Sequence, residues 1–397
     1  MKITHIITGL SADGAETMLH RLLQAFDPKA YAHEVICLTN RGALAERIES
    51  LGIQVQVLNM TPGVPNPLAL RSLSSWLRRS RPDIVQTWMY HSDLLGGISA
   101  RIARQKNVIW NVRHSRLSVP PDKYATLLTA RICARLSHWI PVKIVCCSWE
   151  SRDAHIRLGY APAKFETIQN GIDLETFKPD SVARHMLRQE LGIPSEAPVI
   201  GIIARFHPVK GYKTFIEAAG RLHVLRPDVH FILCGERVDC LNGELVNQIK
   251  SAGIASRSHL LGRQDDVEAI AASLDVATSA SLSESFPNVV AEAMACGVPC
   301  VVTDVGGSRA IVGDTGKVIA PQDAVAMVNA WQQLLDTNPD VRRVLGSAAR
   351  QRIENYFSLR ACVRHYEDLY RRVFRASQDG LGTASRPPGT EMPISAA

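Results

Sequence analysis

The chain has 397 residues, 46% of them hydrophobic and 21% charged, and its formal net charge is +7. This length is too great for one ordinary hydrophobic core and predicts two domains of roughly 150 to 200 residues each. The composition is typical of a globular protein, and the sequence lacks an apolar run of about 18 residues, which speaks against a membrane-spanning helix.

Short runs rich in β-branched residues alternate with helical patterns along the chain. Seven runs precede a break rich in proline and charge at 177–198, and they are 3–8, 34–39, 55–59, 84–88, 108–112, 144–148 and 166–169. Six more follow, at 199–205, 229–234, 259–262, 276–280, 300–303 and 317–319. Strands that alternate with helices predict β-α-β units and parallel sheets. We therefore expect an α/β protein with two doubly wound, Rossmann-like domains that face each other across a cleft.

The expected domain boundaries follow from the same alternation of strands and helices. The first domain is predicted at 1–175 and the second at 176–355, with apolar positions spaced for a further helix at 356–375. The last residues, 376–397, are rich in Gly, Ser, Thr and Pro, so we expect a disordered tail there.

The N-terminus and the cysteines both point to the cytoplasm. The first residues read as a short strand that enters a glycine turn, because they lack the apolar stretch of a signal peptide. The nine cysteines are odd in number and irregularly spaced, which disfavours a disulfide framework. No His/Cys cluster has zinc spacing, so we predict neither a metal site nor a bound cofactor.

The positive charge lies in the first half of the chain. Residues 1–180 hold 22 Lys/Arg against 15 Asp/Glu, and the excess is strongest in 71–157, with 15 against 5. A solvated face would explain this excess, and so would a surface that meets anionic lipid head groups at the inner face of a membrane. Nucleic acid is disfavoured, because basic and aromatic residues do not interleave.

One helical pattern in this basic region is a candidate contact helix. Its apolar positions are Tyr124, Leu128, Ile132 and Leu136, bracketed by Lys123, Arg131 and Arg135. The same spacing also fits a helix whose apolar side faces the core.

Two strand ends of the first domain carry candidate residues. The turn with Gly9 and Gly14 follows the first strand and opens a helix, although it is neither a Walker loop nor a G-x-G-x-x-G motif. Arg113 and His114 end the fifth strand. A lone histidine is more often structural than catalytic, so both interpretations of His114 stay open.

Two cations meet at one strand end of the second domain. Arg205 ends the run at 199–205, and Lys210 follows on the loop before a helix. Fixed cations in a cleft stabilise the charge that develops on a departing phosphate group. Arginine suits bidentate phosphate contact and lysine acts as a point charge. The alternative is a pair of ordinary surface cations.

Two carboxylates flank a predicted helix start. Seven residues separate Glu284 from Glu292, and Pro287 lies between them where a helix would begin. Glu284 is then on the loop and Glu292 within the helix, unless Glu292 is simply an exposed helical carboxylate. The free N–H groups of a helix start can hold a phosphate, and here they belong to Phe286, Asn288 and Val289.

The segment from Glu284 to Glu292, with its continuation to Gly306 and Gly307, resembles the E-x7-E region of retaining glycosyltransferases of the GT-B fold, family 4. Arg205 and Lys210 are similar to the R-x4-K element of that family. The turn before Gly14 resembles its Gly-Gly-Ala-Glu turn, although Asp13 stands where the first glycine usually does. The likeness covers the chain to about residue 375.

This resemblance implies a metal-independent, retaining hexosyltransferase with a nucleotide diphosphate sugar as donor, UDP being preferred over GDP. The acceptor would be a hydroxyl of a lipid-linked or polysaccharide intermediate. The first domain would hold the acceptor and the second the sugar nucleotide, and the helix at 356–375 would cross back to the first domain.

The resemblance also implies a role for each site residue. Arg205 and Lys210 would neutralise the diphosphate, and Glu284 and His114 would act at the donor sugar. Glu292 would bind the ribose. The remaining donor contacts would come from Gly14, Gly262, Arg263, Phe286, Pro287, Asn288 and Val289.

Two other classes of protein remain compatible with these residues. A GT-B epimerase would consume sugar nucleotide without an acceptor, and a phosphorylase would need inorganic phosphate. A non-catalytic sugar-nucleotide-binding partner is disfavoured, since such a subunit would be expected to have lost some of these four residues: Glu284, Arg205, Lys210 and His114.

Overall fold

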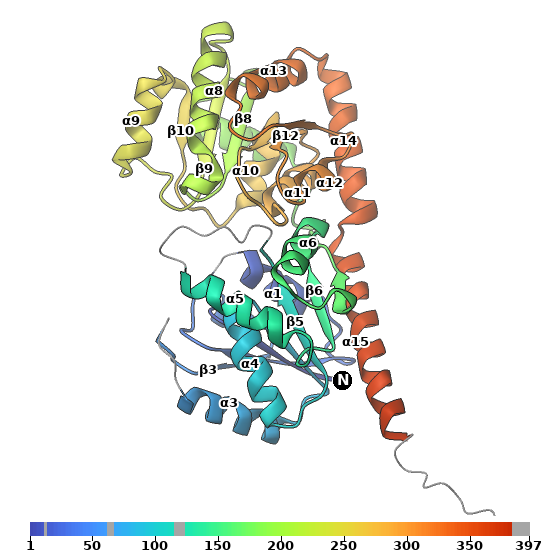
Figure 1. Cartoon of the computed structure of the whole chain (residues 1–397). Coiled ribbons are helices and arrows are strands. Elements are labelled where there is room, and N and C mark those ends of the chain that lie inside the picture. The colour runs from blue at the N-terminus through green and yellow to red at the C-terminus, as the bar shows by residue number, and fades with distance from the viewer. Residues whose placement is uncertain (12–13, 62–66, 115–123, 383–397) are drawn as a thin grey trace, which may run out of the picture.

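The computed structural model of the chain describes residues 1–11, 14–61, 67–114 and 124–382, and it forms two α/β domains (Figure 1). The first domain contains a 7-stranded sheet in the order β3-β2-β1-β4-β5-β6-β7, and the second a 6-stranded sheet in the order β10-β9-β8-β11-β12-β13. All neighbouring strands that pair in register do so in parallel. The predicted α/β class with two doubly wound sheets is confirmed.

The elements of the first domain are the strands β1 (Lys2–Ile7), β2 (Ala32–Cys37), β3 (Gln54–Val57), β4 (Ile84–Trp88), β5 (Val108–Val112), β6 (Lys143–Cys146) and β7 (Phe165–Thr167). Its helices are α1 (Gly14–Ala25), α2 (Leu44–Glu49), α3 (Pro67–Ser80), α4 (Tyr90–Ile102), α5 (Tyr124–Leu136) and α6 (Trp149–Leu158), with a 3-10 turn η2 (Pro162–Lys164).

The strands of the second domain are β8 (Val199–Ile203), β9 (His230–Cys234), β10 (Ser258–Leu260), β11 (Val276–Ser279), β12 (Cys300–Thr303) and β13 (Lys317–Ile319). Its helical segments are α7 (Ser181–Glu190), η3 (Pro208–Lys210), α8 (Tyr212–Leu225), α9 (Gly243–Ser251), η4 (Ala255–Arg257), α10 (Val267–Ser273), α11 (Asn288–Ala295), α12 (Ser308–Val312), α13 (Ala324–Leu335) and α14 (Pro339–Tyr356). The last helix is α15 (Leu359–Gly382).

Each of the predicted strands is present, and the differences lie at the ends. The sequence extends one strand to residue 205, whereas β8 ends at Ile203, and it extends another to residue 59, whereas β3 ends at Val57. Apolar runs define the buried centre of a strand well, but the residues that leave the sheet have no such signature.

The strand order reverses once in each sheet, between β1 and β4 and between β8 and β11. In an open parallel sheet, ligands bind outside the carboxyl ends of the strands at such a switch point. The loops that follow β1, β4, β8 and β11 therefore define where a site is expected.

Helix α15 returns to the first domain after α14. Figure 1 shows α14 and α15 running along one side of both domains. The buried face of α15 joins the apolar core of the first domain through Cys362, Val363, Tyr366, Leu369, Tyr370 and Val373. The segment that leaves the first domain contacts the start of α15 at Ile172. The Ile172 N–H donates to the Phe357 carbonyl at 2.8 Å, and the Ile172 carbonyl accepts from the Leu359 N–H at 2.8 Å.

The expected tail begins later than predicted. Helix α15 continues to Gly382, so the expectation of a disordered segment from residue 376 is wrong for the first residues of that segment. Contacts with the first domain extend into this part of the helix, since Asn107 Nδ2 donates to Ser377 Oγ at 3.1 Å. The rest of the predicted tail, 383–397, lies outside the described residues, as do Asp13 and Lys123.

Helix α5 turns its large apolar side chains outward. Tyr124, Leu128 and Ile132 are 68%, 60% and 39% exposed, whereas the buried residues of the helix are Ala130, Cys133 and Ala134. Leu136, the fourth apolar position of the pattern, is half-buried and packs against the core of the first domain. The core-facing interpretation is therefore wrong for Tyr124, Leu128 and Ile132 and correct for Leu136. A stripe of exposed apolar residues is instead available for contact.

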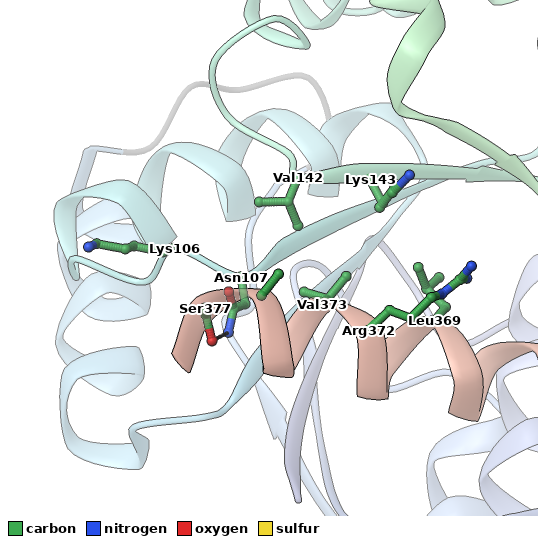
Figure 2. A pocket seen from close by; sticks show the side chains of 9 residues that line it. Lys106, Asn107, Val142, Lys143, Leu369, Arg372, Val373 and Ser377 are labelled. Carbon is green, nitrogen blue, oxygen red and sulfur yellow. Dashed lines mark hydrogen bonds between the residues drawn. The ribbon is translucent and has the colours of Figure 1, made fainter. Parts of the chain in front are cut away.

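A groove of about 520 Å³ lies between α15 and the first residues of β5 and β6 (Figure 2). Lys106, Lys143 and Arg372 line it together with Val142 and Val373. Because β5 and β6 begin there, the groove is at the sheet edge opposite to the predicted cleft. It is therefore separate from the candidate site described next.

Candidate active site

Lys210 and Glu284 meet at the carboxyl ends of the second sheet. Lys210 Nζ lies 2.6 Å from Glu284 Oε1, and Ser281 Oγ donates to the same oxygen at 2.7 Å. Lys210 closes the turn η3 after β8, whereas Ser281 and Glu284 follow β11. Two of the predicted catalytic side chains are thus in direct contact, and a cation and a hydroxyl fix the position of the Glu284 carboxylate.

Two glycines allow the loops of this edge to approach closely. Gly306 has φ +52°, and a Cβ at this position would lie 1.7 Å from the Glu284 carbonyl oxygen. Gly211 has φ +72°, and its Cβ would lie 1.9 Å from the Ala280 carbonyl oxygen. A side chain at either position would combine backbone strain with overlap, so glycine is required at both. The backbone of the loop that carries Glu284 therefore packs directly against the backbone at Gly306.

Helix α11 begins a few residues after Glu284, and its first residue contacts the first domain. Pro287 precedes the helix with an extended backbone, φ −73° and ψ 92°, so the helix begins at Asn288. Phe286 is buried against Phe357, with ring centroids 5.8 Å apart, and Val289 packs against the core of the second domain. The side chains of Phe286 and Val289 therefore anchor the helix start, which leaves their backbone groups as the possible ligand contacts.

The N-terminus of α1 faces that of α11. A Cβ at Gly14 would lie 3.9 Å from Asn288 Nδ2, and Asn288 Oδ1 accepts from Asn170 Nδ2 at 2.8 Å. Helix N-termini carry unpaired N–H groups and the positive end of the helix dipole. Two such ends close together make the space between them attractive to an anion.

Glu292 is buried and bound to the other domain. Its Oε1 lies 2.7 Å from Arg21 Nη2 of α1, and the residue is 6% exposed. The alternative of an exposed helical carboxylate is therefore wrong. Sequence reasoning did not find Arg21, because nothing in the pattern of α1 distinguishes this arginine from one on a solvated helix face.

His114 lies at the end of β5 within a frame of polar contacts. Its ring stacks on Tyr90, with centroids 5.3 Å apart and planes at 20°, and its carbonyl accepts from Ser151 Oγ at 2.7 Å. Tyr90 OH and His155 Nε2 are 2.8 Å apart, and His155 Nδ1 lies 2.6 Å from the Ser151 carbonyl. The four residues thus form a closed set of contacts.

The protonation of this frame follows from burial. Desolvation lowers the pKa of His155 to about 4, so this imidazole is neutral near pH 7. The Ser151 carbonyl can only accept, so Nδ1 carries the proton and Nε2 accepts from the Tyr90 hydroxyl. Sequence analysis singled out His114 but missed its supporting residues, which come from α4 and α6.

Arg113 joins the first domain to α15. Its guanidinium donates to Asn111 Oδ1 at 3.1 Å and to Tyr366 OH at 3.1 Å, and also to Asn170 Oδ1. It lies over the Trp88 ring, 4.9 Å from the centroid. The Arg113 guanidinium is therefore bonded to other groups of the protein, at the junction between the domains.

Arg205 and Arg263 are exposed, and both follow strands of the second sheet. Arg205 follows β8, and Arg263 follows Gly262 beyond the end of β10. Gly262 N–H donates to the Val238 carbonyl at 2.8 Å, which fixes the backbone of that loop. Within the described ranges, no three His, Cys, Asp or Glu side chains come together in a way that could hold a metal ion.

Two doubly wound parallel sheets in separate domains match the GT-B architecture, and the comparisons agree. Residues 12–176 match the family described as Glycosyltransferase Family 4, and residues 197–337 match Glycosyl transferases group 1. Together these ranges take in most of the chain. The chain belongs to the family 4 glycosyltransferases and is a glycosyltransferase.

Two curated relatives align over most of their length. The chain is 28% identical over 312 residues to the UDP-Gal:alpha-D-GlcNAc-diphosphoundecaprenol alpha-1,3-galactosyltransferase of Escherichia coli, covering 76% of this chain and 78% of that protein. It is 28% identical over 368 residues to the D-inositol 3-phosphate glycosyltransferase of Corynebacterium urealyticum, covering 85% of each.

Solved structures show the same fold. Anabaena HepE in complex with UDP superimposes with a TM-score of 0.81 at 23% identity, over 93% of this chain and 99% of that one. The sucrose-phosphate synthase of Thermosynechococcus elongatus has a TM-score of 0.76 at 20% identity, over 95% and 100%. The predicted GT-B architecture is confirmed.

Proposed function

We propose that the protein is a retaining, metal-independent hexosyltransferase that moves a sugar from a nucleotide diphosphate sugar to a hydroxyl of a lipid-linked or polysaccharide acceptor in glycan assembly. The observation that carries the proposal is the contact of Lys210 with Glu284 at the start of α11. A cation and a carboxylate held together at a helix N-terminus suit a ligand with an anionic part and a hydroxyl-rich part.

The anionic part is the diphosphate. Arg205, Lys210 and the N-termini of α1 and α11 would supply positive potential to this part of the ligand. When the bond between the anomeric carbon and the diphosphate breaks, the electron pair stays on the departing phosphate oxygen. Preorganised cations stabilise that added charge more than they stabilise the ground state, which is the condition for lowering the barrier. The same residues are the reason for expecting no metal ion.

The hydroxyl-rich part is the donor sugar and the ribose. Glu284 would accept hydrogen bonds from sugar hydroxyls and stabilise positive charge at the anomeric carbon, and His114 would lie on the acceptor side of the same sugar. Glu292 would accept from the ribose hydroxyls. Arg263 and the backbone of Gly262 would contact the nucleobase.

UDP is the preferred donor nucleotide in this proposal. HepE, which shares the fold, was crystallised with UDP, and the Escherichia coli relative is named for UDP-Gal. Retention of the anomeric configuration rests on the resemblance of the Glu284 to Glu292 segment to retaining enzymes. Proton NMR of the anomeric signal of the product would distinguish retention from inversion.

The acceptor side favours a membrane-bound intermediate. The exposed side chains of Tyr124, Leu128 and Ile132 form an apolar stripe on α5, and Arg131 and Arg135 on the same helix are exposed. Apolar and cationic side chains together suit the surface of an anionic bilayer. The Escherichia coli relative is named for a diphosphoundecaprenol acceptor. We therefore propose a cytoplasmic enzyme with peripheral contact to the inner face of the membrane. None of the described helices has the length and hydropathy to span one.

A Glu284→Gln variant tests the proposal. The amide keeps the shape but loses the charge, so sugar transfer should fall by about 100-fold or more while UDP still binds. Glu244→Gln, at the start of α9, serves as a matched control and should transfer normally. Undiminished transfer in Glu284→Gln would contradict the role assigned to this carboxylate.

A further inference from the structure

Arg21 reaches from the first domain into the second. Its Nη2 lies 2.7 Å from Glu292 Oε1, and the two side chains are 16% and 8% exposed. The same guanidinium lies over the Phe177 ring, 5.5 Å from the centroid, and Phe177 belongs to the core of the second domain. Both contacts of this α1 residue are therefore made with the part of the chain that carries the proposed donor site.

The burial of this ion pair sets it apart from other pairs between the domains. The pair of Arg47 with Asp265 also bridges them, but at 3.6 Å and with side chains 60% and 86% exposed. An exposed pair contributes little, whereas removing one partner of a buried pair leaves an uncompensated charge. The position of the Glu292 carboxylate thus depends strongly on Arg21.

Arg21 and Glu292 lie behind the meeting point of two helix N-termini. At the front, the start of α1 at Gly14 approaches Asn288 at the start of α11. Further along the same two helices, Arg21 meets Glu292. The two helices therefore approach each other at their starts and are joined by the ion pair further along, which holds the proposed ribose carboxylate behind the proposed phosphate site.

We propose that Arg21 is a positioning residue that fixes Glu292 for the nucleotide ribose and does so only while the two domains are together. This role rests on the proposed function of Glu292. The contact uses Oε1, so Oε2 is the oxygen that would accept from the ribose. Because one partner belongs to each domain, nucleotide affinity and domain closure are thermodynamically linked through this pair.

A double-mutant cycle on nucleotide affinity tests the role. Calorimetric titration with UDP would compare the wild type, Arg21→Met, Glu292→Gln and the double variant. Arg21→Met should weaken binding about tenfold, the usual size of coupling within a contacting pair. In the Glu292→Gln background the same change should cost less than about twofold, since no charge is left to position. Losses that multiply would show that Arg21 acts independently of Glu292 and would overturn the inference.

Two further variants separate charge from bulk. Only one guanidinium nitrogen is in contact with Glu292, so Arg21→Lys should retain more affinity than Arg21→Met. Arg41→Met removes a partly exposed ion pair within the first domain and should leave UDP affinity unchanged. Equal losses in the Lys and Met variants would contradict a positioning role based on charge.

Small-angle X-ray scattering provides a readout that is independent of the ligand. Arg21→Met should remain folded but have a larger radius of gyration than the wild type, because the domains lose a buried contact. An unchanged radius would contradict the coupling to closure. If Glu292→Gln itself leaves UDP affinity unchanged, the assignment of Glu292 to the ribose in the proposed function is wrong. If Glu292→Gln weakens binding but the losses of the two single variants multiply in the double variant, only the role of Arg21 is wrong.

Discussion

The two edges of the cleft are built in different ways. The edge of the second domain consists of charged side chains on short turns that glycines hold against backbone, as in Lys210 with Glu284 over Gly306. The edge of the first domain consists of stacked rings and a neutral histidine, as in Tyr90 with His114 and His155. The first kind of construction is suited to bind and stabilise charge, and the second to hold a side chain at a fixed orientation.

The difference also affects what each edge tolerates. At the edge of the second domain, the contact of Lys210 with Glu284 depends on loops that pack against each other at glycines. A single methyl group at such a glycine would displace the backbone of these loops. The frame around His114 depends on hydrogen bonds among side chains, which can be removed one at a time. Variants at the two edges should therefore differ in severity as well as in the kinetic constant that they change.

The largest effect is expected for Gly306→Ala. The new Cβ would overlap the Glu284 carbonyl, whose oxygen lies 1.7 Å from its position, so the loop must move. A misplacement of about 1 Å at a catalytic group can cost about 100-fold in rate, and we expect a loss of transfer of that order. Gly253→Ala is the matched control, because φ is +73° there but nothing lies within 4 Å of the added Cβ. Similar losses in both variants would show that backbone strain, and not the Glu284 contact, is responsible.

Stability should fall on acidification through histidine pairs in both domains. His5 contacts His33 at 3.1 Å, and His230 contacts His259 at 3.0 Å. Burial lowers the pKa of His33 and of His230 to about 4, and it also lowers the pKa of His5 and His259. The unfolded chain takes up these protons first, so stability is retained above about pH 6.5 and is lost toward pH 4.

The slope of this loss is at most about 1.4 kcal/mol per pH unit for each histidine. Urea unfolding between pH 7 and 4.5 would measure it. A His33→Gln variant should show a shallower pH dependence than the wild type. If both proteins depend equally on pH over this window, the pair in the first domain does not contribute.

A smaller effect is expected for Tyr90→Phe. The change removes the hydroxyl that bonds to His155 Nε2 but keeps the ring under His114. We expect kcat to fall about tenfold, the upper range for one hydrogen bond, with UDP affinity unchanged. Steady-state kinetics and UDP titration check this pair of results. A loss of UDP affinity of equal size would show that Tyr90 supports the donor site and not the acceptor edge.

The smallest effect is expected on the outer face of the first domain. Leu128→Ser removes an apolar side chain that is 60% exposed on α5, so folding should be unaffected. Binding to vesicles that contain anionic phospholipid should weaken about fivefold, in line with the partial burial of one leucine. Co-sedimentation would measure this, with the exposed Leu241→Ser in the second domain as control. Equal effects of the two changes would argue against α5 as the contact surface.

The fold and the donor edge could be predicted because their signals are local. Each strand is a continuous apolar run, and the segment from Glu284 to Glu292 keeps the carboxylates and the helix start within one stretch of chain. The pairing of Arg21 with Glu292 could not be predicted, since 271 positions separate the two residues. The frame of His114 likewise draws Tyr90 from α4 and both Ser151 and His155 from α6, two helices that are far from His114 and from each other in the chain.

One interpretation that the sequence left open and one wrong prediction have a common physical cause. The spacing of Tyr124 and Leu128 is the same for a helix face that is covered and one that is not, and only the tertiary structure decides between them. The composition after residue 376 favours disorder, but α15 continues to Gly382 and contacts the first domain as far as Ser377. In both cases contacts with distant parts of the chain decide what local composition leaves open.

The central claim is that the second edge of the cleft binds a nucleoside diphosphate through fixed cations. Thermal unfolding in the presence of UDP, GDP or ADP tests it most directly, because a ligand bound only by the native state raises Tm by mass action. We expect a rise with UDP in the wild type and its loss in Arg205→Ala and Lys210→Ala. The absence of a rise with all three nucleotides, or an undiminished rise in both variants, would contradict it.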